Sequence, residues 1–187
     1  TTADRPHTGD EGRPSTGWHA EFGDVNNDAR DDIFVAKGNV GQMPDAAMRD
    51  PNTLLVQRAD GTFEERAAEA GIATVERARG AVLADLNLDG ALDLAVVNRR
   101  AGMELWQSAS VTGNWLLVGL SAPRPNTQAV GAFVELRTGA GVQTREVTVG
   151  GGHAGGKAGL MHFGLGAAER ADIRVTWPGG AVSEWQD

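Results

Sequence analysis

The stretch "LADLNLDGALDLAVVN" (residues 83–98) places three Asp and one Asn in a nine-residue window, directly ahead of an apolar, β-branched run. Its side-chain oxygens recur at positions 1, 3, 5 and 9, which are Asp85, Asn87, Asp89 and Asp93, and position 6 is Gly90. Three interpretations are open at this point. The loop binds a cation, it is a plain surface turn, or it belongs to a larger repeat.

The same pattern occurs once more, nearer the N-terminus. The segment "GWHAEFGDVNNDARDDIFVAKGN" (17–39) aligns with "RGAVLADLNLDGALDLAVVNRR" (79–100) at a constant offset of 61 residues, which is 85 minus 24. This match of four oxygen-bearing side chains and their flanking strands indicates an internal duplication, and strand-rich units of this length are typical of β-propeller blades. The aligned side chains of the first copy are Asp24, Asn26, Asp28 and Asp32.

The composition favours a globular β-protein and argues against several functions. Glycine is abundant, at 26 of 187 residues, which favours short strands joined by tight turns. A net charge of −8 with scattered Lys and Arg argues against a nucleic-acid-binding surface. The chain has no Cys, so disulfide frameworks and thiolate chemistry are excluded. No apolar run has the length of a membrane span.

Further segments predict strands and turns. Residues 52–66, "NTLLVQRADGTFEER", predict a hairpin that turns at 59–61, and residues 66–71 predict one helical turn ended by glycine. After residue 110 the acidic loops stop, and short strands with period-two apolar residues alternate with Gly, Pro and Asn turns as far as "AVSEW" (181–185).

These segments together predict an all-β chain. The expected fold is a partial β-propeller of two blades, followed by a small domain that resembles a β-sandwich. We expect an N-terminal tail or linker at residues 1–16, the two propeller repeats with their loops at 17–110, and the second β-domain at 111–187.

Both acidic loops predict a calcium site. Several hard oxygen donors without His or Cys suit Ca²⁺, whereas zinc and copper prefer nitrogen or sulfur. The backbone carbonyl at position 7 can join the side chains, and Gly90 permits the sharp turn. The loops are not EF-hands, because position 12 is Val96 rather than Glu and strands flank the loop. The predicted ligands are Asp85, Asn87, Asp89, Ala91 and Asp93 in one loop, and Asp24, Asn26, Asp28, Arg30 and Asp32 in the other.

The expected role of the ion is structural. A divalent cation neutralises carboxylates that otherwise repel one another, so Ca²⁺ should clamp the two strands of each blade. We expect the first loop to bind less tightly or to be empty, because Ala29 replaces the glycine at a position where a side chain is strained and Arg30 brings a positive charge. The alternative is that Asp, Asn and Gly gather in turns through local hydrogen bonds alone. Two loops in register argue against that alternative.

The repeats resemble a known family. "FGDVNNDARDDIFVA" (22–36) is similar to FG-GAP repeats, also called VCBS repeats, and keeps the Phe22-Gly23 pair. The second half resembles the ASPIC/UnbV domain in "NTQAVGAFVEL", "QTREVTVGGG", "HFGLG" and Trp177-Pro178. This resemblance implies an exported, calcium-binding β-propeller with an appended β-domain, located outside the cell or in the periplasm, that acts in adhesion or recognition.

Two blades cannot close a propeller, which needs about four to eight. We therefore expect the open sheet edges to be covered by missing blades, by another chain or by the C-terminal domain. The chain starts without an initiator Met or an apolar signal region, and we expect it to be a C-terminal fragment of a longer protein.

Other chemistry is weakly indicated. "GGHAGGKA" (151–158) imitates a phosphate-binding loop, but Ala158 stands where Ser or Thr should be and a strand follows, so an ordinary loop is expected. None of the four His residues has metal-ligand spacing, and no Gly-x-Ser-x-Gly motif is present. The expected function is therefore recognition of a protein or glycan ligand rather than catalysis. An enzyme of the UnbV type, secreted or in a natural-product pathway, remains the alternative.

Overall fold

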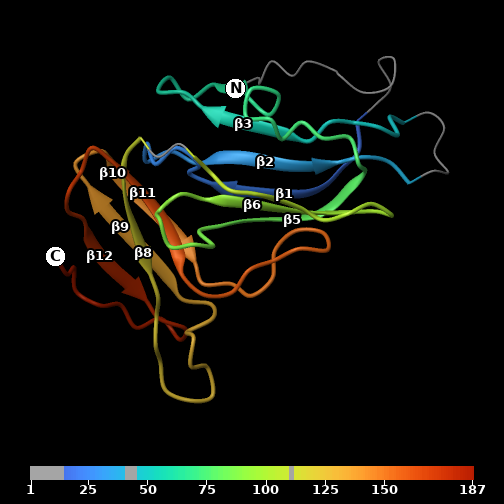
Figure 1. Ribbon diagram of the computed structural model, residues 1–187. Helices are drawn as coiled ribbons and strands as arrows, with labels where there is room; N and C mark the ends of the chain where they lie inside the picture. Colours follow the sequence, from blue (N-terminus) through green and yellow to red (C-terminus); the bar gives the residue numbers. More distant parts are fainter. Residues whose placement is uncertain (1–14, 41–45, 110–111) are drawn as a thin grey trace.

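The computed structural model describes residues 15–40, 46–109 and 112–187, and in these residues every regular element is a β-strand (Figure 1). The strands form separate antiparallel sheets that do not close into a barrel or ring. The predicted all-β class is therefore confirmed. Most of the predicted N-terminal tail, and the predicted domain boundary at 110/111, lie outside the described residues. No described segment is a helix long and apolar enough to cross a membrane.

The first sheet is a simple antiparallel meander. Consecutive strands pair in the order β1-β2-β3-β4. The predicted hairpin is the β3–β4 pair, closed at Gly61 with a φ of 80°. The predicted helical turn is also present, because the amide of Ala70 donates to the carbonyl of Arg66 at 2.9 Å. The strands are β1 (Gly17–Gly23), β2 (Asp32–Lys37), β3 (Thr53–Gln57) and β4 (Phe63–Glu65).

The second sheet repeats the first strand pair in detail. It contains β5 (Ala78–Ala84), β6 (Asp93–Asn98) and β7 (Glu104–Trp106), in that order. Each first strand has a register shift at the same place, between Gly17 and His19 in β1 and between Ala78 and Gly80 in β5. These positions differ by the same 61 residues as the acidic loops, so the duplication extends to the backbone.

The two sheets pack face to face over one apolar core. Side chains from alternate positions of the strands point into it, as the period of two predicts. The other faces of the two sheets carry exposed apolar side chains, including Phe22 at 64% and Leu105 at 62% exposure. The core includes Phe34 and Ala36 of β2, Ala81 and Leu83 of β5, and Leu94 and Val96 of β6.

The C-terminal segment forms two further sheets around a second core. Strand orders are β10-β9-β12 and β11-β8, and Val134, Leu136 and Phe163 are fully buried between the sheets. This two-layer arrangement is that of a small sandwich. The strands are β8 (Asn114–Val118), β9 (Phe133–Thr138), β10 (Gly141–Glu146), β11 (Met161–Gly166) and β12 (Asp172–Thr176).

The prediction of a strand at residues 181–185 is wrong. This segment makes one isolated bridge, Val182 with Thr176, and Gln186 just after it makes another, with Ile173. The amide of Val175 donates to the hydroxyl of Ser183 at 3.0 Å. This side-chain bond takes the place of a backbone bond that a regular strand pair would make.

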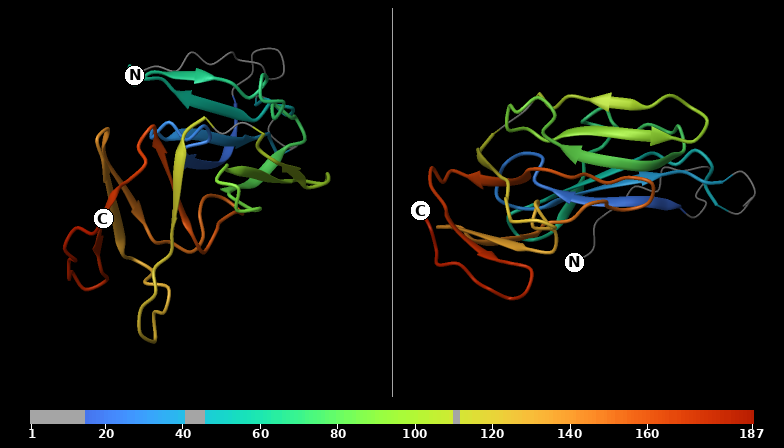
Figure 2. Two further views of the ribbon diagram at one scale, coloured as in Figure 1. Left: turned by 60° about the vertical axis from the view of Figure 1, so that its left-hand side comes forward. Right: turned by 90° about the horizontal axis from the view of Figure 1, so that it is seen from below.

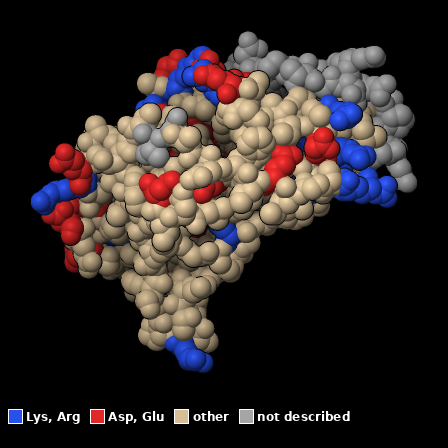
Figure 3. All heavy atoms as spheres, viewed as in Figure 1, with Lys and Arg blue, Asp and Glu red and all other residues tan. Residues whose placement is uncertain are grey.

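The C-terminal sheets lie at the end of the N-terminal sheets where the acidic loops are (Figure 1). The connection between β10 and β11, residues 147–160, reaches back along β1 and β5 (Figure 2). On the face drawn in Figure 3, the Lys and Arg side chains stand in separate small groups.

Candidate metal-binding loops

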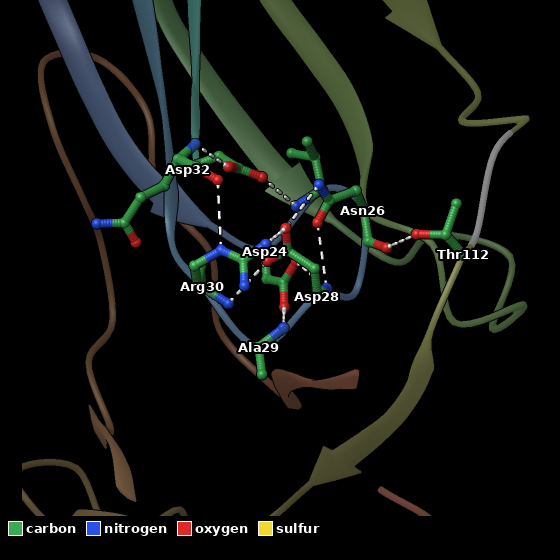
Figure 4. Close-up of polar contacts among 9 residues, drawn as sticks. Asp24, Asn26, Asp28, Ala29, Arg30, Asp32 and Thr112 are labelled. Atoms are coloured by element: carbon green, nitrogen blue, oxygen red, sulfur yellow. Dashed lines mark hydrogen bonds and ion pairs between the residues drawn. The ribbon is translucent and has the colours of Figure 1, made fainter. Parts of the chain in front are cut away.

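The β1–β2 loop is organised by its own side-chain oxygens (Figure 4). The two carboxylate oxygens of Asp24 accept the amides of Asp28 at 3.0 Å and Ala29 at 2.7 Å. The Oδ1 atom of Asn26 accepts the amide of Asp28 at 3.1 Å, and the carboxylate of Asp28 accepts the amide of Arg30 at 3.0 Å. Positions 1, 3 and 5 therefore shape the loop through side-chain-to-backbone hydrogen bonds.

The β5–β6 loop makes the same set of bonds 61 residues later. Asp85 accepts the amides of Asp89 at 3.1 Å and Gly90 at 2.9 Å. Asn87 accepts the amide of Asp89 at 3.1 Å, and Asp89 accepts the amide of Ala91 at 2.9 Å. The two loops thus repeat one pattern of side-chain-to-backbone hydrogen bonds.

The carboxylate at position 9 joins the loop to the next strand. Asp32 accepts the amide of Val25 at 2.9 Å on one oxygen and that of Gln57, at the end of β3, at 2.8 Å on the other. In the second loop Asp93 accepts the amides of Leu86 at 3.2 Å and Ser108 at 2.9 Å. These bonds occupy only part of the lone pairs of each carboxylate.

Both loops require left-handed backbone at two positions. At position 6, Gly90 has a φ of 87° and Ala29 a φ of 68°. At position 4, Asn27 and Leu88 have φ values of 59° and 62°. A residue with a Cβ atom is disfavoured in this region by about 1–2 kcal/mol, so Ala29 carries a cost that Gly90 avoids. The strain expected at Ala29 therefore has a structural basis.

The two loops differ in burial. Position 9 is buried in both loops, with Asp32 0% and Asp93 4% exposed, whereas position 1 is buried in the first loop (Asp24, 1%) and half-buried in the second (Asp85). Positions 3 and 5 are half-buried in the first loop and exposed in the second. Burial raises the pKa of both Asp24 and Asp32 to about 6, although backbone N–H donors act in the opposite direction. The pKa of the exposed Asp89 is lowered, mainly by the hydrogen bond from the Ala91 amide. Ionising the buried pair is therefore costly, and ionising Asp89 is easy.

A cation within the chain already neutralises part of the first loop. A guanidinium nitrogen of Arg30 lies 2.5 Å from Oδ2 of Asp28, and another lies 3.4 Å from the carbonyl oxygen of Gln57. The equivalent residue in the second loop is Ala91, which has no charge. An ion in the first loop would have to compete with Arg30 for Asp28.

The donor set of each loop suits a hard divalent cation. The side chains offer only oxygen, apart from the amide nitrogens of Asn26 and Asn87. Asp24 and Asp32 are buried, and no Lys, Arg or His of the described residues pairs with them. In the described part of the chain, no three His, Cys, Asp or Glu side chains already converge as a ligand cluster.

Sequence reasoning missed a contact between the two loops. The carbonyl oxygen of Gly90 accepts a hydrogen bond from Nδ2 of Asn27 at 2.9 Å and from Nε2 of His162 at 3.0 Å. Asn27 lies at position 4 of the first loop, and His162 lies on β11 of the C-terminal segment. His162 is therefore a packed residue in a strand. Its partner across 72 residues left no sequence signal.

The glycine-rich segment 151–158 packs against the N-terminal sheets and does not form a phosphate-binding loop. A Cβ atom at Gly155 would lie 2.5 Å from the carbonyl oxygen of Ala81, and one at Gly152 would lie 2.7 Å from the His19 ring. The glycines permit this close approach to β1 and β5. Lys157 lies at its end, with Nζ 2.8 Å from Oε1 of Glu21 and 2.7 Å from the carbonyl oxygen of Leu83.

Two hollows lie near the loops. A cleft of about 480 Å³ between the N-terminal sheets is lined by core residues such as Phe34, Leu94 and Trp106. A groove of about 180 Å³ is lined in part by Glu21, Lys157 and His162. In the groove, Glu21 pairs with Lys157 and His162 binds the carbonyl of Gly90, so these groups already have partners.

The two segments match two family models. Residues 24–96 match the family described as FG-GAP-like repeat, and residues 122–187 match the family described as ASPIC and UnbV. The chain therefore joins a segment similar to FG-GAP-like repeats to a segment similar to the ASPIC and UnbV family, as the motifs predicted.

Among curated proteins, the chain is similar to cartilage acidic protein 1 of several vertebrates. It is 30% identical to the Mus musculus and Homo sapiens proteins over 167 residues, which are 85% of this chain and 25% and 24% of those proteins. The Xenopus tropicalis protein is 29% identical over the same length, 25% of that protein. The chain spans about a quarter of the length of the curated relatives that it matches.

Proposed function

We propose that this chain is a calcium-stabilised recognition module of an exported protein, in which Ca²⁺ clamps the strand pairs β1–β2 and β5–β6. One observation carries the proposal. The two loops repeat the same oxygen-bearing side chains, the same hydrogen bonds and the same left-handed positions at an offset of 61 residues. Ordinary turns are stabilised by local hydrogen bonds, but they do not require three carboxylates at the same relative positions in both copies.

The burial of the first loop supports a need for positive charge. Asp24 and Asp32 lose hydration in the fold, and each ionised carboxylate raises the cost of ionising the other. A divalent ion coordinated by these oxygens would remove that repulsion. In the second loop, the exposed Asp89 and Asn87 leave an open approach for an ion.

We assign this module to the extracellular space or the periplasm. Calcium modules of extracellular proteins bind with dissociation constants on the order of 10⁻⁴ to 10⁻³ M, and such sites fill only where calcium is abundant. Millimolar calcium outside the cell would fill the second loop more fully than the first, where Arg30 competes for Asp28. The partner we propose is a protein or a glycan.

Calorimetric titration with CaCl₂ tests the metal assignment. Protein stripped with a chelator should bind with a dissociation constant on the order of 10⁻⁴ to 10⁻³ M, and Asp85→Ala should abolish binding at the second loop. Asp60→Ala is the matched control. Asp60 is an exposed Asp whose carboxylate also accepts a local amide, that of Thr62 at 2.9 Å, but it lies in the β3–β4 turn.

Two results would refute the assignment. One is a titration without saturable heat. The other is an equal loss of binding in Asp85→Ala and Asp60→Ala, because local turn chemistry would then account for both. The recognition role has a separate test, retention on arrays of immobilised glycans and proteins with and without chelator. Retention that calcium does not affect would contradict a calcium-dependent recognition surface.

A further inference from the structure

The two acidic loops form the surface on which the C-terminal segment rests. The amide of Gly166, at the end of β11, donates to the carbonyl of Asn27 at 2.9 Å. The hydroxyl of Thr112 donates to the carbonyl of Asn26 at 2.6 Å, as Figure 4 shows. Nε2 of His162 binds the carbonyl of Gly90. Each loop therefore gives backbone carbonyls from the middle of its turn to the C-terminal segment.

Close packing accompanies these hydrogen bonds. A Cβ atom at Gly164 would overlap the carboxylate of Asp24, and one at Gly90 would overlap the ring of Trp115. A Cβ atom at Gly113 would likewise overlap the carbonyl of Asn27. The approach between the segments is thus set by contacts at loop atoms. A change in the shape of either loop must therefore alter its contacts with β8 or β11.

Ionic contacts hold the same interface from both sides. The guanidinium of Arg145 on β10 pairs with Asp31 of the first loop at 2.5 Å and 2.9 Å. On the other side, Lys157 reaches Glu21 and the carbonyl of Leu83. At the centre, Oδ1 of Asn27 is buried without a hydrogen-bond partner among the described residues. This unpaired atom marks the junction of the two loops and β11 as incompletely satisfied.

We infer that filling of the acidic loops and docking of the ASPIC and UnbV segment are linked, so that Ca²⁺ fixes this segment on the FG-GAP-like repeats. The inference rests on the proposed calcium function and adds that the bound ion also controls docking of the C-terminal segment. An ion would fix the turn that presents the carbonyls of Asn26, Asn27 and Gly90. Because linkage is reciprocal, a docked C-terminal segment must strengthen calcium binding by the same factor.

The Lys157→Gln variant tests docking of the C-terminal segment without altering a predicted calcium ligand. Lys157 contacts no predicted ligand, so its loss should weaken docking alone. We expect it to raise the calcium dissociation constant about 5- to 10-fold, within the usual range of coupling between sites. Simple electrostatics predicts the opposite sign, since removing a cation should favour binding of Ca²⁺. A weaker affinity therefore reports coupling rather than charge.

Arg170→Gln is the matched control. Arg170 is exposed, and within the described part of the chain its one ion pair is with Asp187 of its own segment, at 3.3 Å. This variant removes the same charge without touching the interface, and its calcium affinity should stay within twofold of wild type. A far-UV circular dichroism melt confirms that both variants fold.

Hydrogen exchange of the Gly166 amide gives a second readout on the unaltered chain. This amide donates across the interface, so calcium saturation should slow its exchange at least about fivefold if docking is linked to the ion. Wild-type binding with unchanged Gly166 exchange and equal affinities in both variants would overturn the linkage and leave the calcium function intact. Absence of any calcium binding would instead refute the proposed function.

Discussion

Gly90 serves two physical needs at one residue. Its φ of 87° lies in the left-handed region, and its missing Cβ leaves room for the ring of Trp115. The equivalent Ala29 shows that the first need alone does not exclude a side chain. The contact with Trp115 is therefore what should make glycine indispensable in the second loop.

A pair of substitutions separates these two needs. Gly90→Ala should destabilise the protein by about 3 kcal/mol or more, from backbone strain plus overlap with Trp115. Gly61→Ala should cost only about 1–2 kcal/mol, because Gly61 has a φ of 80° but no neighbour within 4 Å of a Cβ atom. Urea unfolding measures both. Equal costs would show that Trp115 does not rest on the loop.

His162 should make stability depend on pH. Burial lowers its pKa below the ordinary value of 6.5, although the hydrogen bond to the carbonyl of Gly90 and the charge of Asp85 act in the opposite direction. The charges of Lys157 and Arg145 lower it further. The unfolded chain therefore binds this proton more readily, so the contribution is complete above pH 6.5 and is lost as pH falls through the folded-state pKa. Burial raises the pKa of Asp24 and Asp32 to about 6, which acts with the opposite sign.

Comparison with His162→Gln isolates the histidine. The Gln amide can still donate to the carbonyl of Gly90, but it does not titrate. Between pH 7 and pH 5 in the presence of a chelator, the melting temperature of wild type should fall relative to that of the variant. Parallel curves would contradict a neutral, buried His162 at this position.

At the scale of single residues, local patterns could be predicted and long-range contacts could not. The spacing of Asp85, Asn87 and Asp89 was sufficient to predict the loop, because its hydrogen bonds link residues no more than five apart. The pairing of Arg145 with Asp31 spans 114 residues and has no local signature. The domain resemblance also gave no indication that the C-terminal segment would dock on the acidic loops.

The role of the glycine-rich connection between β10 and β11 could not be predicted from its sequence. Its composition indicated only an ordinary loop, yet it packs against the edge strands β1 and β5. Covering such edges reduces pairing with other chains. The alternation of apolar residues did predict most strands, since it depends on neighbours two residues apart. It failed at 181–185, where a serine side chain takes a backbone partner.

The packing of this connection can be tested with two glycines that both have ordinary backbone angles. Gly155→Ala should destabilise by about 2 kcal/mol, because the new methyl group would press on Ala81 and His19. Gly139→Ala meets nothing within 4 Å and should change stability by no more than about 0.5 kcal/mol. Chemical denaturation gives both values. A Gly155→Ala protein as stable as Gly139→Ala would show the connection to be loose.

At the scale of the whole molecule, two sheets share one core, and a second module is docked at the end that carries the acidic loops. The outer faces of both sheets expose apolar side chains such as Phe22 and Leu105. The chain corresponds to about a quarter of its vertebrate relatives. Further blades on these faces, as the resemblance to propeller repeats implies, would bury these side chains and leave the acidic loops in place.

The most direct test of the account is a thermal melt in about 5 mM calcium and in chelator. For sites with millimolar or tighter affinity, calcium should add about 1–2 kcal/mol per filled loop, which raises the melting temperature by about 5 °C. Asp89→Ala should remove most of this rise and Asp28→Ala less, because Arg30 already competes in the first loop. Identical melts of wild type with calcium and with chelator would contradict a calcium clamp.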